Sequence, residues 1–241
     1  MTSFHDPTVG RHNAAALTCD SPLLQALFPF DVAARELRSR GTPDWLLPEE
    51  FVAIQTAAPA RIAEFAAGRQ CAREALAVFG LPVAPLLRGR HRQPLWPEGV
   101  RGSITHTEGY CAAAVAPAAA CAGLGIDAER CGRVGTDLWP ALFGPAEIAA
   151  LRALDPAQCA LLATILFAAK EAFFKSQHAL TGAIPEFHEV GFGLDVPPGV
   201  QGRVVLVNVD DARLDTLQGR VQGRYAVEGT LVVAGVALAA M

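Results

Sequence analysis

A long apolar helix is the strongest constraint that this 241-residue sequence places on its fold. From Pro156 to His178, apolar side chains recur at three- and four-residue steps, which indicates a helix with a wide buried face. The chain has only two lysines, Lys170 and Lys175, and both lie in this segment. An ammonium is a compact point charge whereas a guanidinium is a planar fork, so one interpretation is a specific need for an ammonium here. The bland alternative is a solvated Glu171–Lys175 pair, worth about 0.2–0.5 kcal/mol.

The composition indicates a globular chain without a general affinity for polyanions. Hydrophobic residues make up 51% and charged residues 18%, and the formal net charge of −4 gives no broad attraction for nucleic acid or anionic membranes. We expect no apolar run of membrane-spanning length, and no signal peptide at the amino terminus. The six cysteines are scattered without a CxxC pair, which favours buried thiols in a reducing cytoplasm.

A second helix is predicted from Pro59 to Phe79, where apolar residues again keep helical spacing. It carries Arg61, Arg69 and Arg73, of which the last two share a face. These side chains are either an ordinary basic helix surface or a cationic wall for a multiply phosphorylated ligand. The second interpretation has a physical basis, because the planar guanidinium matches phosphate oxygens in pairs.

A basic loop and a histidine follow this helix. The cationic residues of the loop are Arg88, Arg90, His91 and Arg92. The loop ends at Trp96, between two prolines, so it could hold a phosphate and stack a base, or be a solvated loop with one anchoring tryptophan. His106 is expected at a strand end, where it either donates to a phosphate or is an ordinary structural histidine.

Two carboxylates are predicted on one face of a strand. In the segment 125–129, side chains alternate, so Asp127 and Glu129 point to one side and Ala128 to the other. Neighbouring carboxylates repel unless a cation lies between them, and oxygen ligands of this kind suit Mg²⁺. The alternative is a strand end with two solvated acids. After the long helix, further strands are predicted at residues 189–195, 203–209, 223–228 and 231–238.

Three motifs, taken together and in this order, resemble the Sfp-type 4′-phosphopantetheinyl transferases. They are Trp96-Pro97 with Gly102-Ser103-Ile104-Thr105-His106, then Gly125-Ile126-Asp127-Ala128-Glu129, then Phe167-Ala168-Ala169-Lys170-Glu171-Ala172-Phe173-Phe174-Lys175. The resemblance covers approximately residues 59–240 and extends to the subgroup that serves siderophore, polyketide and fatty-acid synthases. Many members carry a larger aliphatic residue in place of Ala128 and Trp in place of Phe167, but neither departure removes a ligand.

The resemblance implies an α+β fold of two similar α/β halves with pseudo-twofold symmetry, each a small, mainly antiparallel sheet packed on a long helix. Residues 1–120 would form an N-terminal half that carries the coenzyme A phosphate- and adenine-binding residues. Residues 121–241 would form a C-terminal half with the metal-binding carboxylates and the catalytic helix. No internal repeat is visible in the sequence, so this symmetry is inherited from the family.

The resemblance also implies a reaction. The chain would transfer the 4′-phosphopantetheine group of coenzyme A to a serine of an apo acyl or peptidyl carrier protein, with Mg²⁺ or Mn²⁺, and release 3′,5′-adenosine bisphosphate. A cytoplasmic monomer with no nucleic-acid or membrane partner is expected. Two alternatives stay open: a Mg²⁺-dependent nucleotide pyrophosphate hydrolase, and a coenzyme A-binding protein without transfer activity.

The same resemblance assigns the site residues. Three carboxylates would hold the metal, and these are Asp127, Glu129 and Glu171. Glu171 would also act as the base, directly or through a metal-bound water, with Lys175 and His106 on the phosphates. The remaining coenzyme A contacts would be Arg61, Arg69, Arg88, Arg92, Ser103 and Lys170. Arg90 or Arg92 could replace Arg88 at the 3′-phosphate, and residues 1–58 receive no role.

Overall fold

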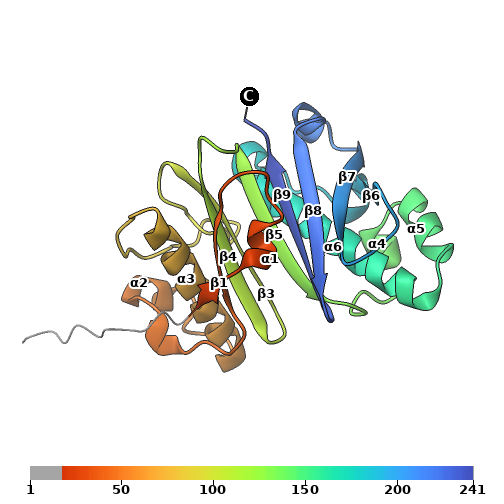
Figure 1. The fold of residues 1–241 in the computed structure, drawn as a ribbon. Helices are drawn as coiled ribbons and strands as arrows, with labels where there is room; N and C mark the ends of the chain where they lie inside the picture. The colour runs from red at the N-terminus through yellow and green to blue at the C-terminus, as the bar shows by residue number, and fades with distance from the viewer. Residues whose placement is uncertain (1–17, 241) are drawn as a thin grey trace, which may run out of the picture.

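The computed structural model describes residues 18–240, which form two antiparallel sheets side by side (Figure 1). The first sheet has the strand order β1 (Cys19–Asp20), β2 (Ala33–Leu37), β4 (Tyr110–Pro117), β3 (Val100–Thr107). The second has the order β5 (Gly123–Arg130), β9 (Leu231–Leu238), β8 (Val221–Glu228), β7 (Gln201–Val209), β6 (Val190–Leu194). The amino-terminal segment on which the signal-peptide expectation rests lies outside the described residues.

One long helix packs on each sheet. Helix α3 (Pro59–Val78) covers β4 and β2, and α6 (Pro156–Thr181) covers β5 and β9. The shorter helices are α1 (Pro22–Gln25), η1 (Pro43–Trp45), α2 (Pro48–Val52), α4 (Trp139–Leu142), α5 (Pro145–Arg152), η2 (Phe187–Glu189) and η3 (Ala212–Leu217). This arrangement confirms the α+β fold class, with an antiparallel sheet and a long helix in each part. The pseudo-twofold relation and the division at residue 120 stay predictions.

Helix α6 begins and ends at strong capping residues. The side chain of Asp155 accepts hydrogen bonds from the amides of Ala157 (3.0 Å) and Gln158 (3.1 Å), and Gly182 closes the helix at φ 64°. By length and composition alone this helix could cross a membrane, so the expectation that no segment reaches that length is wrong. In the fold its apolar face instead packs on the second sheet and forms the largest apolar core.

Two glycines of β5 let α6 approach the strand closely. A Cβ atom at Gly125 would overlap the carbonyl oxygen of Ala172, and one at Gly123 would overlap that of Ser176. Because side chains alternate along β5, Asp127 is the next residue on the face that the helix covers. The close approach therefore brings this carboxylate beside the polar side chains of α6.

Side chains, rather than a backbone ladder, join β3 to β5 at the seam between the sheets. The hydroxyl of Ser103 accepts a hydrogen bond from the amide of Ile126 (3.0 Å), and that of Thr105 accepts one from the amide of Ala128 (2.9 Å). On the opposite face, one continuous apolar core runs beneath both sheets. The two parts of the chain are thus packed as one unit, and the site is built across their seam.

Candidate active site

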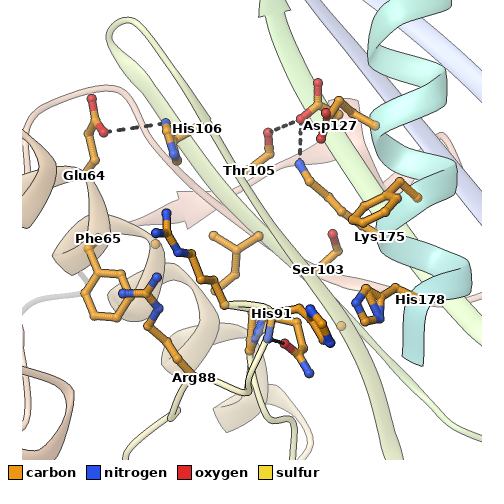
Figure 2. Close-up of a pocket in the computed structure, with 18 of the residues that line it drawn as sticks. Glu64, Phe65, Arg88, His91, Ser103, Thr105, His106, Asp127, Lys175 and His178 are labelled. Carbon is orange, nitrogen blue, oxygen red and sulfur yellow. Dashed lines mark hydrogen bonds and ion pairs between the residues drawn. The ribbon is translucent and has the colours of Figure 1, made fainter. Parts of the chain in front are cut away.

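A cleft of about 480 Å³ opens between α3 and α6, with β3 and β5 as its floor (Figure 2). This volume lies in the ordinary range for small-molecule sites. All the predicted site residues except Lys170 line it, and they are Arg61, Arg69, Arg88, Arg92, Ser103, His106, Asp127, Glu129, Glu171 and Lys175. The cleft therefore brings together side chains from both sheets that lie far apart in the sequence.

Asp127 is the centre of the acidic part of the cleft. Its Oδ1 accepts hydrogen bonds from Lys175 Nζ (2.6 Å) and from the hydroxyl of Thr105 (3.0 Å). Lys175 Nζ also donates to the carbonyl of Ile126 (3.2 Å). Oδ2 of Asp127 is buried, and among the described residues it has no hydrogen-bond partner. A buried carboxylate oxygen without a partner is costly, which indicates that a ligand belongs there.

Burial and the charge of Asp127 disfavour the ionised forms of Glu129 and Glu171. Burial and the neighbouring Asp127 raise the pKa of Glu129 to about 7. Burial also raises the pKa of Glu171, with Asp127 adding to the shift and Lys175 opposing it. Burial tends to lower the pKa of Lys175, but the carboxylates of Asp127 and Glu171 outweigh it, so the net shift is upward and the ammonium stays charged. The single ammonium of Lys175 does not neutralise the negative charge of three carboxylates. A bound cation would balance the remaining charge and favour their ionised forms.

The residues present fit a hard divalent cation, although they do not form a complete set of metal ligands on their own. Within residues 18–240, no group of three or more His, Cys, Asp or Glu side chains is arranged to hold a metal ion. The predicted convergence of Asp127, Glu129 and Glu171 is thus met only as a shared cleft lining. Mg²⁺ needs no more than that, because it usually takes one or two carboxylates together with substrate phosphates and several waters.

Arginines form the cationic part of the cleft. Arg69 is only 4% exposed; its Nε donates to the carbonyl of Leu86 (2.8 Å) and its guanidinium lies over the ring of Phe65, 4.1 Å from the centroid. Burial lowers its pKa to about 10, and its Nη2 has no partner in the described part of the chain. Arg88 Nη1 donates to the carbonyl of Ala53 (3.2 Å). Because backbone carbonyls hold these two guanidiniums, their charge is available to an anion.

A strained turn places Arg92 in the cleft. Gly89 and Gln93 close the turn with an amide–carbonyl hydrogen bond of 2.8 Å, and Arg92 inside it has a φ of 67°. A left-handed backbone is unfavourable for a side chain of this size, and such strain is concentrated at functional sites. Of the loop arginines, Arg88 and Arg92 line the cleft and Arg90 does not.

His106 is a neutral hydrogen-bonding residue in the free protein. Burial, with Arg61 adding to it, lowers the pKa of the imidazole. Nε2 lies 2.5 Å from Arg61 Nη1, and Nδ1 lies 3.8 Å from the carboxylate of Glu64. Since the guanidinium can only donate, Nε2 must accept and the proton is on Nδ1. An anionic phosphate in the cleft would favour the imidazolium instead.

Lys170, predicted as a cofactor contact, lies away from the cleft that the other predicted site residues line. Its side chain is 2% exposed and lies outside the cleft. Nζ donates to Glu147 Oε2 (2.7 Å) and to the carbonyls of Leu142 (2.7 Å) and Phe187 (2.9 Å), which uses all three of its protons. It therefore fixes the segments around α4, α5 and η2 to α6.

Two further side chains have structural partners that the sequence did not reveal. Ser103 lines the cleft, but its hydroxyl is engaged by the backbone of Ile126, so it joins the sheets rather than offering a free donor. Arg73 shares a helix face with Arg69 but turns into the protein, where it pairs with the buried Glu50 at 2.7 Å. The cationic wall on α3 is thus made by Arg61 and Arg69.

The structure adds cleft residues that had no assigned role. Thr105 binds the carboxylate of Asp127, and His91 meets His178 with ring centroids 5.2 Å apart. Nε2 of His178 is buried and unpartnered among the described residues. Helical spacing could have revealed His178, because it lies one turn beyond Lys175 on the stripe that begins at Glu171. No local sequence pattern indicates that Thr105, rather than Ser103, contacts the carboxylate of Asp127.

Comparisons with known proteins match this architecture along most of the chain. The model of the 4'-phosphopantetheinyl transferase N-terminal domain matches residues 48–116, and that of the 4'-phosphopantetheinyl transferase superfamily matches residues 123–227. The chain is 41% identical to 4'-phosphopantetheinyl transferase Svp of Streptomyces mobaraensis, over 81% of this chain and 79% of that one. It is 36% identical to 4'-phosphopantetheinyl transferase PptT of Mycobacterium tuberculosis, over 86% of this chain and 92% of that one.

More distant similarities cover about half of the chain. Enterobactin synthase component D of Escherichia coli is 34% identical over 58% of this chain and 66% of its own length. A solved holo-(acyl-carrier-protein) synthase of Bacillus anthracis in complex with CoA is 20% identical, with a TM-score of 0.40, over 50% of this chain and 98% of its own. From the two family models and the two relatives matched over most of their length, the chain belongs to the 4′-phosphopantetheinyl transferase family.

Proposed function

We propose that this protein transfers the 4′-phosphopantetheine group of coenzyme A to a serine of an apo acyl or peptidyl carrier protein. The observation that carries the proposal is the cleft itself, where arginines from α3 and the basic loop face a carboxylate–lysine cluster on β5 and α6. The arginines suit the phosphates of a multiply phosphorylated cofactor, and the carboxylate–lysine cluster suits a reacting pyrophosphate. Family membership supports the same reaction.

The cationic residues bind the phosphates of coenzyme A. Arg69, Arg88 and Arg92 hold the adenosine end, with either Arg88 or Arg92 at the 3′-phosphate. Arg61 and His106, which lie in contact with each other, bind the pyrophosphate. In this arrangement residues 1–120 supply the cofactor phosphate contacts, and residues 121–241 supply the metal ligands and the base.

The acidic residues and Lys175 carry the chemistry. Asp127, Glu129 and Glu171 would hold Mg²⁺, or Mn²⁺ in its place, which when bound would neutralise charge on the pyrophosphate. The hydroxyl oxygen of the carrier serine attacks the β-phosphorus, and the bond to 3′,5′-adenosine bisphosphate breaks. Glu171 accepts the serine proton, because burial raises its pKa and makes it a stronger base than an exposed carboxylate. The ammonium of Lys175 stabilises phosphate charge.

We infer that the partners are the acidic carrier domains of fatty-acid, polyketide, peptide or siderophore synthases, modified in the cytoplasm by a monomeric enzyme. A relative named as an enterobactin synthase component supports the siderophore class. No membrane or nucleic-acid partner enters the reaction, in agreement with the net charge of −4.

One assay tests the proposal. The protein is incubated with coenzyme A, Mg²⁺ and an apo carrier protein, and the carrier is weighed by mass spectrometry. A gain of one phosphopantetheine group that EDTA abolishes supports the proposal. Cleavage of coenzyme A without a carrier would identify a hydrolase, and binding without either reaction would identify a coenzyme A-binding protein.

A further inference from the structure

Thr105 makes a contact that connects the first sheet to the carboxylate of the second. It lies on β3, is 2% exposed, and its hydroxyl has two partners across the seam. It accepts a hydrogen bond from the amide of Ala128 (2.9 Å) and donates one to Oδ1 of Asp127 (3.0 Å). Because an amide can only donate and an ionised carboxylate can only accept, the hydroxyl accepts from Ala128 and gives its proton to Asp127.

The two oxygens of Asp127 are consequently unequal. Oδ1 is held from two directions, by Thr105 of β3 and by Lys175 of α6 (Figure 2). Oδ2 is buried and, within the described chain, receives no donor. Two donors on one oxygen fix the rotation of the carboxylate, so the other oxygen is the one left for a ligand. Groups that orient metal-binding carboxylates in this way are part of metal sites in general.

We propose that Thr105 is a positioning residue, which holds Oδ1 of Asp127 so that Oδ2 is presented to the divalent cation. This inference rests on the proposed function, because it concerns the metal that the transfer reaction would use. It assigns Thr105 a role that acts through Asp127, without contact to the cofactor. The affinity of the Asp127 site for the metal would therefore depend on Thr105, a residue of the other sheet.

Ser103 provides a matched control on the same strand. Its hydroxyl is equally buried and accepts a hydrogen bond from the neighbouring β5 amide, that of Ile126 (3.0 Å). It has no bond to a carboxylate among the hydrogen bonds of the described residues. Removing either hydroxyl leaves one β5 amide unpaired, but only the Thr105 change also frees Asp127.

The test measures Mn²⁺ binding by electron paramagnetic resonance, with coenzyme A present and no carrier, after subtraction of the Mn²⁺ bound by coenzyme A alone. Thr105→Val should weaken Mn²⁺ binding by about 10- to 100-fold, the usual effect of removing a group that orients a metal ligand. Thr105→Ser should bind Mn²⁺ with an affinity within about threefold of the wild-type value, because the serine hydroxyl still donates to Asp127. Ser103→Ala should also stay within about threefold of wild type, because this change removes no donor to Asp127.

Steady-state transfer gives the second readout. The Mg²⁺ concentration for half-maximal rate should rise in Thr105→Val while the rate at saturating Mg²⁺ stays close to wild type. If the valine variant does not fold, Thr105→Ala replaces it, because the smaller side chain cannot clash.

The outcomes separate this inference from the proposed function. If wild type transfers phosphopantetheine but Thr105→Val binds Mn²⁺ as tightly as Ser103→Ala, the positioning role is wrong and the transferase stands. Equal losses in both variants would also overturn it, because they would reflect damage to the seam. If wild type binds no Mn²⁺ beyond coenzyme A alone, the metal site and the inference both fall.

Discussion

Replacement of Lys170 by methionine should destabilise the fold while leaving the chemistry of the cleft intact. Lys170 Nζ pairs with Glu147 in the interior, and removing one partner of a buried ion pair costs about 3–5 kcal/mol. Glu147 keeps two other donors, the amides of Gly144 (2.9 Å) and Phe192 (2.9 Å). These remaining bonds place the expected loss near the lower limit, about 3 kcal/mol.

Thermal and urea unfolding followed by circular dichroism measure this loss. For a chain of this size, about 3 kcal/mol corresponds to a fall in Tm of about 6–12 °C. Transfer per folded molecule, measured by the mass of the carrier, should stay near wild type because the side chain lies outside the cleft.

Lys175→Met is the matched control, since it changes the only other lysine of the chain. Lys175 is 27% exposed, and Asp127 would keep its bond from Thr105. This variant should therefore lose transfer and lose less stability than Lys170→Met. A Lys170→Met protein with unchanged Tm and no transfer would refute the reasoning and return Lys170 to the cofactor.

Three further predictions follow from the same geometry. Glu171→Gln should abolish transfer and largely spare coenzyme A binding by calorimetry, and full activity would exclude Glu171 as the base. Gly125→Ala should lower both Tm and transfer, because the added Cβ overlaps the carbonyl of Ala172 and separates α6 from β5; a wild-type Tm would contradict the close approach. The pKa of His106 is lowered in the free protein and should rise when pyrophosphate binds, so coenzyme A affinity should increase as the pH falls from 7 toward 6. His106→Gln should reduce this pH dependence, and an unchanged slope would assign it to another group, the cofactor phosphate included.

Local patterns predicted much of the fold and the cleft. Helical spacing located α3 and α6 to within a few residues, and strand alternation placed Asp127 and Glu129 on one face. The strands β1 and β2 and the short helix α1 were not predicted. They lie in a segment with little periodicity, and β2 is a strand because it pairs with the distant β4.

The sequence by itself determined which residue types lie near the reaction, and tertiary packing decided what each of them does. Lys170 and Lys175 flank Glu171 on one helix, and spacing alone treats them alike. Glu147 packs against one side of α6 and β5 against the other. The ammonium of Lys170 is therefore buried in an ion pair with Glu147, whereas that of Lys175 faces the cleft beside Asp127. Ser103 and Thr105 differ in the same way, because only the latter meets Asp127 across the seam. Periodicity is a property of neighbouring residues, whereas the partner of each side chain comes from a distant segment that only the folded chain brings into contact.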